Sequence, residues 1–226
     1  MSMRTPAALE YEELICPICN KHKAKRFCPA KGEMICAVCC GTEREVTIDC
    51  PSDCTYLIAG RRHDAERHEP DWQKAPFPDQ HIPHAVFEAN ELLFSRLVYV
   101  ICVFAAENPT LVDADILAAA TAAAETYQTL ASGILYENPP SYRLQLELYG
   151  KLRQAVEDHK KETPAGIAAI RSVRDSEMRD FMVLFAQIAS IRSNGRPKGR
   201  AFLDSMRSQF KPGTFDRREP KIILAP

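Results

Sequence analysis

The chain has 226 residues, which is enough for one large domain or two small ones. Its 46% hydrophobic and 26% charged residues are typical of a globular protein and exclude a disordered or fibrous chain. The formal net charge of −1 gives no indication for or against a nucleic-acid partner.

Residues 1–14 are predicted to form a mobile lead. This lead has no apolar core and is acidic near its end, so we expect no secretory signal. The most apolar run, Leu92 to Ala106, contains Arg96 and is too short for a membrane span. We therefore expect a cytoplasmic protein with no membrane partner. In the cytosol thiols stay reduced, and clustered cysteines then indicate a metal site rather than disulfides.

Residues 16–54 contain eight of the nine cysteines. Two pairs have the spacing C-x-x-C, and the last pair has the spacing C-x-x-x-C. This spacing favours zinc, because nearby loop residues can place two sulfurs about 3.8 Å apart around a tetrahedral ion with Zn–S bonds of about 2.3 Å. Eight thiols fill two four-coordinate sites, so the sequence predicts a module with two Zn²⁺ per chain, over residues 15–69. The eight are Cys16, Cys19, Cys28, Cys36, Cys39, Cys40, Cys50 and Cys54.

Two pairings of these thiols are open. Sequential filling would put the first four cysteines on one ion and the last four on the other. Interleaved filling keeps both C-x-x-C pairs in one site and lets the neighbours Cys39 and Cys40 serve different ions, and we favour it for that reason. A helix beginning near Pro51 would then place the last two thiols on one face. The interleaved sets are Cys16, Cys19, Cys36 and Cys39 for site 1, and Cys28, Cys40, Cys50 and Cys54 for site 2.

This arrangement resembles the cross-brace zinc fingers of the HIT, MYND and B-box type, over about forty residues. The resemblance rests on the first C-x-x-C pair, Cys28-Pro29, the second C-x-x-C pair and the closing Cys50 and Cys54. It departs from the HIT pattern at Lys31, where that pattern has a cysteine, and Cys40 is the substitute ligand that we expect. The resemblance implies a docking module without catalytic activity, which binds proteins and in some members nucleic acids.

Other chemistries for the cysteines are less well supported by the spacing. An iron–sulfur cluster is the minor alternative, because four thiolates also hold iron, although the usual spacings differ. Catalytic zinc needs an open coordination position, and two closed four-thiolate sites leave none. Redox chemistry at a C-x-x-C pair needs a thioredoxin-like context, which is not visible. We therefore expect no enzymatic activity.

After the cysteines the sequence predicts a trailing helix that Pro70 stops. Four prolines between residues 70 and 83 predict a semi-extended linker. Apolar periodicity then predicts an all-α bundle of four to five helices over residues 84–210. The first helix is expected to run from His84 to Asn108-Pro109, and Thr163-Pro164 is expected to open the fourth. A basic tail is expected over residues 211–226.

Two basic stretches are candidates for contact with nucleic acid. One is the loop between Cys19 and Cys28, and the other is the segment 192–218, which has eight Lys and Arg against two Asp, with phenylalanines between them. The predicted contact residues are Lys21, Lys23, Lys25, Arg26, Arg196, Lys198 and Arg200. The leading functional hypothesis is a zinc-binding interaction or adaptor protein with an unidentified protein partner. The alternative is a nucleic-acid- or ribosome-associated factor.

Overall fold

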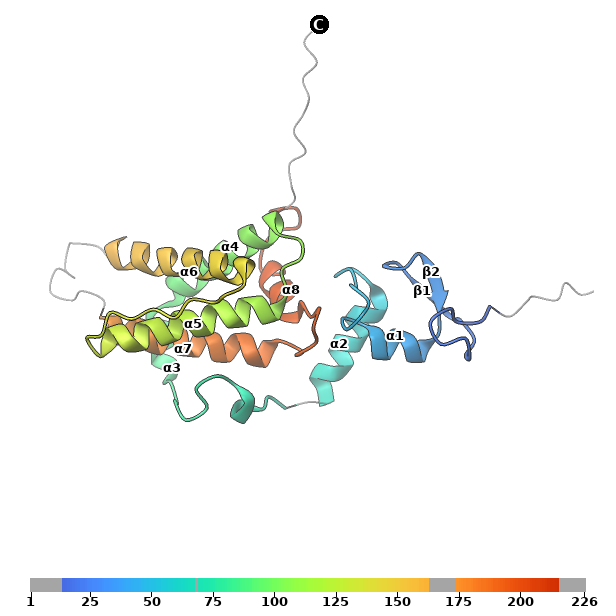
Figure 1. Cartoon of the computed structure of the whole chain (residues 1–226), viewed down its shortest axis with the longest axis horizontal. Helices are drawn as coiled ribbons and strands as arrows, with labels where there is room; N and C mark the ends of the chain where they lie inside the picture. The colour runs from blue at the N-terminus through green and yellow to red at the C-terminus, as the bar shows by residue number, and fades with distance from the viewer. Residues whose placement is uncertain (1–13, 68, 163–173, 216–226) are drawn as a thin grey trace, which may run out of the picture. The chain divides into compact units, whose positions relative to one another are not determined.

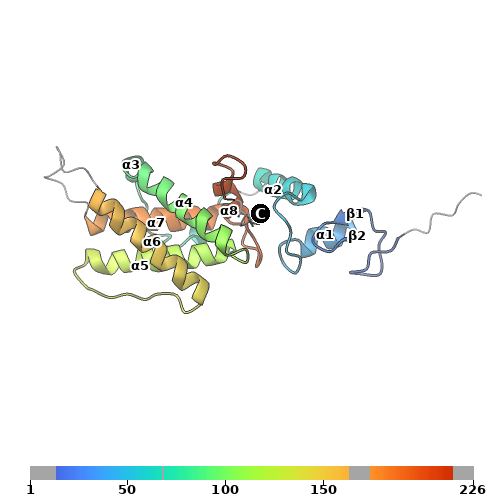
Figure 2. The ribbon, with the colours of Figure 1, turned by 90° about the horizontal axis from the view of Figure 1, so that it is seen from above.

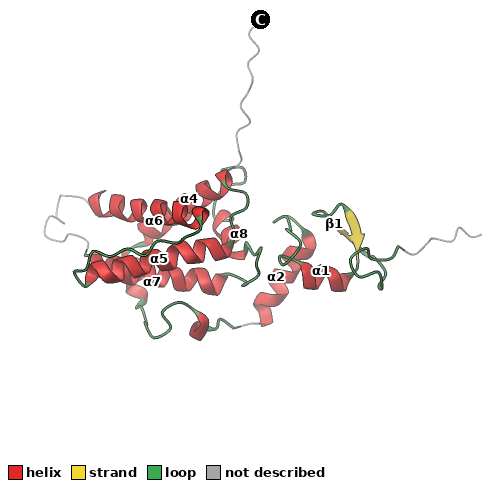
Figure 3. Cartoon of the chain, viewed as in Figure 1, coloured by secondary structure: helices red, strands yellow, loops and turns green. Residues whose placement is uncertain are grey.

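The computed structural model describes residues 14–67, 69–162 and 174–215. The chain divides into two compact units, residues 1–65 and residues 66–226. The described residues contain eight α-helices and one two-stranded ribbon (Figures 1 and 3). The fold is thus mainly helical, with a cysteine-rich N-terminal unit. None of the helices in the described ranges is long and apolar enough to cross a membrane.

The N-terminal unit is built from short elements around the cysteines. Strands β1 (Arg26–Cys28) and β2 (Glu33–Ile35) pair antiparallel, with Phe27 opposite Met34. Gly32 adopts φ +69° in the turn between them, a conformation that side chains disfavour. Helices α1 (Ala37–Glu43) and α2 (Thr55–Arg67) follow. Besides cysteines, the apolar core contains little more than Ile35 and Ile48, which is too small a core to stabilise a domain of this size alone.

The helical unit has a continuous apolar core. Its helices are α3 (His84–Ala89), α4 (Glu91–Glu107), α5 (Asp113–Ala131), α6 (Arg143–Glu162), α7 (Asp175–Arg192) and α8 (Ala201–Arg207). Helix α5 lies beside α7 and also packs on α6, and α4 packs on α6 (Figures 1 and 2). Buried alanines of α5, including Ala119, Ala120 and Ala123, permit this close approach.

The first predicted helix is two helices in the structure. Asn90, with φ −127° and ψ 23°, ends α3 and precedes α4. Its side-chain amide donates to the carbonyl oxygen of Val86, and this local bond competes with continuation of the helix. The range 84–210 therefore contains six α-helices in its described part, rather than four or five. The predicted cap at Thr163-Pro164 lies outside the described residues.

The proline-rich stretch 70–83 packs on the helical unit. It contains the short 3-10 helix η1 (Trp72–Lys74), and Phe77 contacts the core of this unit. The buried amide of Gln187 in α7 donates to the carbonyl oxygens of Phe77 and Gln80, at 3.1 and 3.0 Å. Trp72 remains 53% exposed. The stretch that the sequence predicts as a linker is thus held along part of its length by α7.

Candidate metal centre

The structure brings four thiols together in the N-terminal unit. The sulfur atoms of Cys16, Cys19, Cys36 and Cys39 all lie within 4.8 Å of one another. The Sγ atoms of Cys19 and Cys36 are 3.9 Å apart, close to the edge of about 3.8 Å expected for a tetrahedral zinc–thiolate site. These are the four residues of predicted site 1, and this donor set could hold a metal ion.

Local backbone structure positions each C-x-x-C pair. The first pair sits in a tight turn, in which the amide of Cys16 donates to the carbonyl of His22 and the amide of Asn20 donates to the carbonyl of Cys16. Asn20 adopts φ 52°, which asparagine tolerates better than most residues. In the second pair Cys36 is the N-cap of α1, and its sulfur accepts the amide hydrogen of Cys39 at 3.3 Å. The start of a helix therefore orients two of the four ligands.

Hydrogen bonds around this cluster favour the thiolate form of Cys19. Hydrogen bonds from the backbone at Lys21 and from the side chain of His22 lower the pKa of Cys19 to about 5. The Nδ1 atom of His22 lies 3.4 Å from the Cys19 sulfur. Burial raises the pKa of Cys39, and its hydrogen bonds to Cys36 and Cys19 act in the same direction. A bound zinc ion would favour the deprotonated form of all four thiols, because thiols bind zinc as thiolates.

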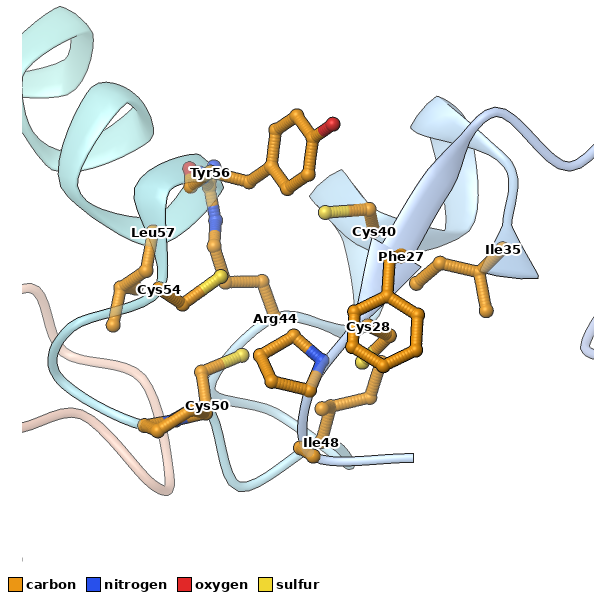
Figure 4. Close-up of a pocket in the computed structure, with 13 residues that line it drawn as sticks. Phe27, Cys28, Ile35, Cys40, Arg44, Ile48, Cys50, Cys54, Tyr56 and Leu57 are labelled. Atoms are coloured by element: carbon orange, nitrogen blue, oxygen red, sulfur yellow. Dashed lines mark hydrogen bonds between the residues drawn. The ribbon is translucent and has the colours of Figure 1, made fainter. Parts of the chain in front are cut away.

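The other four clustered thiols line one small cavity. Cys28, Cys40, Cys50 and Cys54 surround a space of about 10 Å³, about the size of a single water-sized sphere. Figure 4 shows the sulfurs of Cys40, Cys50 and Cys54 turned into this space. In the described residues only the first set has all its ligand atoms within 4.8 Å of one another. The second set is therefore gathered around a common cavity, but with wider sulfur separations than a bound zinc ion requires.

The last two thiols do not share a helix face as predicted. Helix α2 begins at Thr55 rather than near Pro51. Cys50 and Cys54 lie in the turn before it, which the amide of Cys54 closes by donating to the carbonyl of Pro51. The prediction was wrong about the helix start: residues 51–54 form a separate turn, and helical bonding begins where the amide of Ile58 donates to the carbonyl of Cys54. The turn still directs both thiols toward the cavity.

Two charged residues that follow α1 connect the cavity to α2. Arg44 lines the cavity, and its Nη1 donates to the carbonyl oxygen of Tyr56 at 3.0 Å. The neighbouring Glu45 is only 2% exposed and pairs with Arg61 at 2.5 Å. Arg44 thus brings a positive charge to the second thiol set, where it would offset the charge of a four-thiolate site. No local sequence signal indicated these contacts, because the partners are 12 and 16 residues apart.

The predicted nucleic-acid contacts fall into two different environments. In the loop after Cys19 the side chains of Lys21, Lys23 and Lys25 are exposed, while Arg26 is half-buried, with its guanidinium 4.8 Å from the centre of the Tyr56 ring. In the helical unit Arg196, Lys198 and Arg200 are all half-buried. The guanidinium of Arg200 donates to the carbonyl oxygens of Leu111 and Pro109. Arg200 therefore stabilises the turn before α5. Arg217 and Arg218 lie outside the described residues.

No family model, curated protein or solved structure matches this chain. The interpretation of the cysteines therefore rests on their own geometry and on the chemistry of thiol ligands.

Proposed function

We propose that the chain binds two structural zinc ions and that the resulting module is a non-enzymatic docking element of an adaptor protein. Site 1 is formed by the four clustered thiols, and site 2 by the four thiols around the cavity, in the interleaved pairing. The observation that carries the proposal is the first cluster, whose four sulfur atoms all lie within 4.8 Å of one another, with 3.9 Å between those of Cys19 and Cys36.

Site 2 is supported by the convergence of its ligands from separate segments. Cys28 ends β1, Cys40 lies in α1, and Cys50 and Cys54 flank the turn before α2, yet all four border the same cavity. Zinc would draw these sulfurs to about 3.8 Å from one another. The small apolar core of this unit is a second argument, because small domains need metals or disulfides for stability.

A docking role is supported by two features of the N-terminal unit, the closed coordination of both proposed ions and the exposed apolar side chains. Four thiolates close each coordination sphere, so neither ion would offer a position for substrate or water. The same unit exposes large apolar side chains, among them Phe27 at 55% on β1 and Val38 at 56% on α1. Exposed aromatic and aliphatic residues on a rigid scaffold are typical of protein-binding surfaces.

The metal content is tested on protein purified without added zinc. Elemental analysis is expected to give two zinc ions per chain and no iron. One zinc ion per chain would contradict site 2, and a coloured protein that contains iron would contradict the choice of metal.

The interleaved pairing is tested with single ligand substitutions and native mass spectrometry. Cys39→Ser and Cys40→Ser are matched variants at neighbouring positions of α1. In the interleaved scheme they weaken different sites, so combining Cys39→Ser with Cys16→Ser weakens one site only, whereas combining Cys40→Ser with Cys16→Ser weakens both. In the sequential scheme the two double variants would lose metal alike.

The docking role is tested by capturing partners with the full chain and with Phe27→Asp. We expect at least one partner to be lost with Phe27→Asp and retained with Leu135→Asp, a control at an 84% exposed residue of the helical unit. An identical set of bound proteins for all three chains would argue against docking at β1.

A second candidate function is binding of single-stranded nucleic acid by the N-terminal unit. It is favoured by the three exposed lysines at positions 21, 23 and 25, which precede the exposed Phe27 and could contact phosphates while the ring stacks on a base. Binding of a labelled oligonucleotide should then weaken steeply with salt and be lost when the three lysines are replaced by glutamate. Weak binding that the charge reversal leaves unchanged would refute this function.

A further inference from the structure

The helical unit has an open groove between α4 and α6. Its volume is about 350 Å³, within the range of sites that hold small ligands or a few peptide side chains. The α4 wall contains Tyr99, Val103 and Phe104, and the α6 wall contains Lys151 and Ala155. The lining is thus mainly apolar, and an open apolar groove of this kind is typical of a binding site.

Three aromatic rings form one edge of this groove. The Tyr99 ring, 52% exposed, lies 6.2 Å from the ring of Phe210 and 5.9 Å from that of Phe215, centre to centre. The rings of Phe210 and Phe215 are 4.8 Å apart and nearly perpendicular, and both residues are half-buried. Aromatic-lined grooves are the surfaces against which proline-rich extended segments pack. The aromatic edge therefore indicates the chemistry of the occupant.

The same unit exposes a segment of this chemistry, residues 134–142, between α5 and α6. Leu135 is 84% exposed and Tyr142 is 74% exposed. Between them, the pair Pro139-Pro140 fixes its own φ angles and keeps the residue before each proline extended. Among the described residues, none forms a hydrogen bond with the backbone of this pair or of its two neighbours. The segment is thus a preformed extended ligand, as in a polyproline helix.

Contacts with α5 and α6 hold this segment away from the groove of its own chain. Thr129 Oγ1 donates to the carbonyl oxygen of Tyr136 at 2.7 Å, and Glu137 forms an ion pair with Arg153 on α6. Arg153 is two residues from Lys151, which lines the groove, so the two side chains leave α6 in nearly opposite directions. In Figure 2 the segment runs outside α5, on the side away from α4. A second chain must therefore supply the occupant.

We propose that the segment 134–142 of one chain occupies the groove between α4 and α6 of a second copy. Pro139 and Tyr142 are three residues apart, which is one turn of a polyproline helix, so both can face the aromatic edge at Tyr99. The contact is heterologous, because one copy contributes the segment and the other the groove. This self-association belongs to the helical unit and is separate from the docking role proposed for the N-terminal unit.

The area of the contact predicts weak association. Aromatic side chains bury about 150–250 Å² each, so the exposed parts of Tyr136, at 59%, and Tyr142 contribute about 200–330 Å². With Ile134, Leu135 and the groove side included, the interface reaches roughly 1,000 Å², at the low end of specific interfaces. We therefore expect a Kd between about 1 µM and 1 mM.

The test is sedimentation velocity of the full chain under reducing conditions, up to a concentration of about 1 mM. The wild-type chain should associate as its concentration rises. A groove variant, Tyr99→Asp, and a segment variant, Pro139→Asp with Tyr142→Asp, should each raise the Kd at least about tenfold, because each places charge against an apolar surface. Circular dichroism checks that both variants are folded.

Mixing the two variants is the decisive measurement. The groove variant keeps an intact segment, and the segment variant keeps an intact groove, so the mixture should associate although neither variant does so alone. Leu92→Asp is the matched control on α4, at a 68% exposed residue that does not line the groove, and should associate like the wild type. Phe27→Asp should also leave association unchanged, which separates this contact from docking at β1.

Three results would overturn the proposal. The first is a wild-type chain that stays monomeric up to about 1 mM. The second is association that both variants retain, or that Leu92→Asp or Phe27→Asp weakens as much as they do. The third is a mixture of the two folded variants that remains monomeric.

Discussion

Replacement of Gly60 by alanine should loosen the contact between α2 and the second thiol set. Gly60 lies inside α2, where alanine is normally the better residue. A Cβ atom at this position would, however, lie 1.4 Å from Nη1 and 2.3 Å from Cζ of Arg44. The guanidinium would have to leave its place, and its hydrogen bond to the carbonyl oxygen of Tyr56 would be lost.

The expected cost follows from two opposing contributions. Loss of a hydrogen bond from a charged donor costs about 1.5–3 kcal/mol. The higher helix propensity of alanine returns up to about 1 kcal/mol. With the full propensity gain, Gly60→Ala should therefore lower the free energy of unfolding of the N-terminal unit by about 0.5–2 kcal/mol. In α1 the control Gly41→Ala should be neutral or stabilising, because nothing lies within 4 Å of the added Cβ.

The assay is release of zinc from the full chain in guanidinium chloride, at a fixed free zinc concentration, since bound ligand shifts the apparent stability. A double-mutant cycle with Arg44→Ala isolates the contact. In the Arg44→Ala chain the clash is gone, so Gly60→Ala should become stabilising by up to about 1 kcal/mol. The reasoning is refuted if Gly60→Ala has the same effect with and without Arg44.

Two further predictions concern the removal of zinc and a buried hydrogen bond in the core of the helical unit. Removal of zinc with a strong chelator should unfold the N-terminal unit, because a structural zinc ion would contribute about 10–16 kcal/mol to its folding, and should leave the helical unit folded, because that unit has its own core. The circular dichroism spectrum of the chain should keep most of its helical signal, and loss of nearly all of this signal would contradict the prediction. Tyr127→Phe should lower the melting temperature of the helical unit, since the fully buried hydroxyl donates to Glu157 at 2.9 Å and such a bond is worth about 1–3 kcal/mol, whereas Tyr142→Phe, at a 74% exposed residue, should have no effect in the same scan.

The buried Tyr127 also shows why some ionisable groups escape prediction from sequence. Burial, followed by the hydrogen bond to Glu157, raises the pKa of this tyrosine, so its hydroxyl stays protonated and acts as a donor. Its partner is 30 residues away on α6. Periodicity places both residues on helices, but it cannot indicate which polar atoms meet between them.

The sequence by itself determined the features that depend on local spacing. Pairs of cysteines separated by two residues predict a metal knuckle, and the structure gathers Cys16, Cys19, Cys36 and Cys39 in one cluster that could hold a metal ion. Apolar periodicity likewise predicts the long helices, because a helix face repeats every three to four residues. Asn90 shows the limit of this argument, since apolar periodicity continues through the break between α3 and α4.

Only the tertiary structure decided the contacts between distant segments. The buried carboxylate of Asp113 accepts the amides of Phe202 and Leu203 and so orients the start of α8, from 89 and 90 residues away. Arg44 reaches Tyr56 beside the second thiol set, and the ring of Phe215 returns to that of Tyr99 on α4. These contacts depend on how the chain folds back on itself. Ligand spacing and helical periodicity are local, and for that physical reason the sequence alone carried no signal for them.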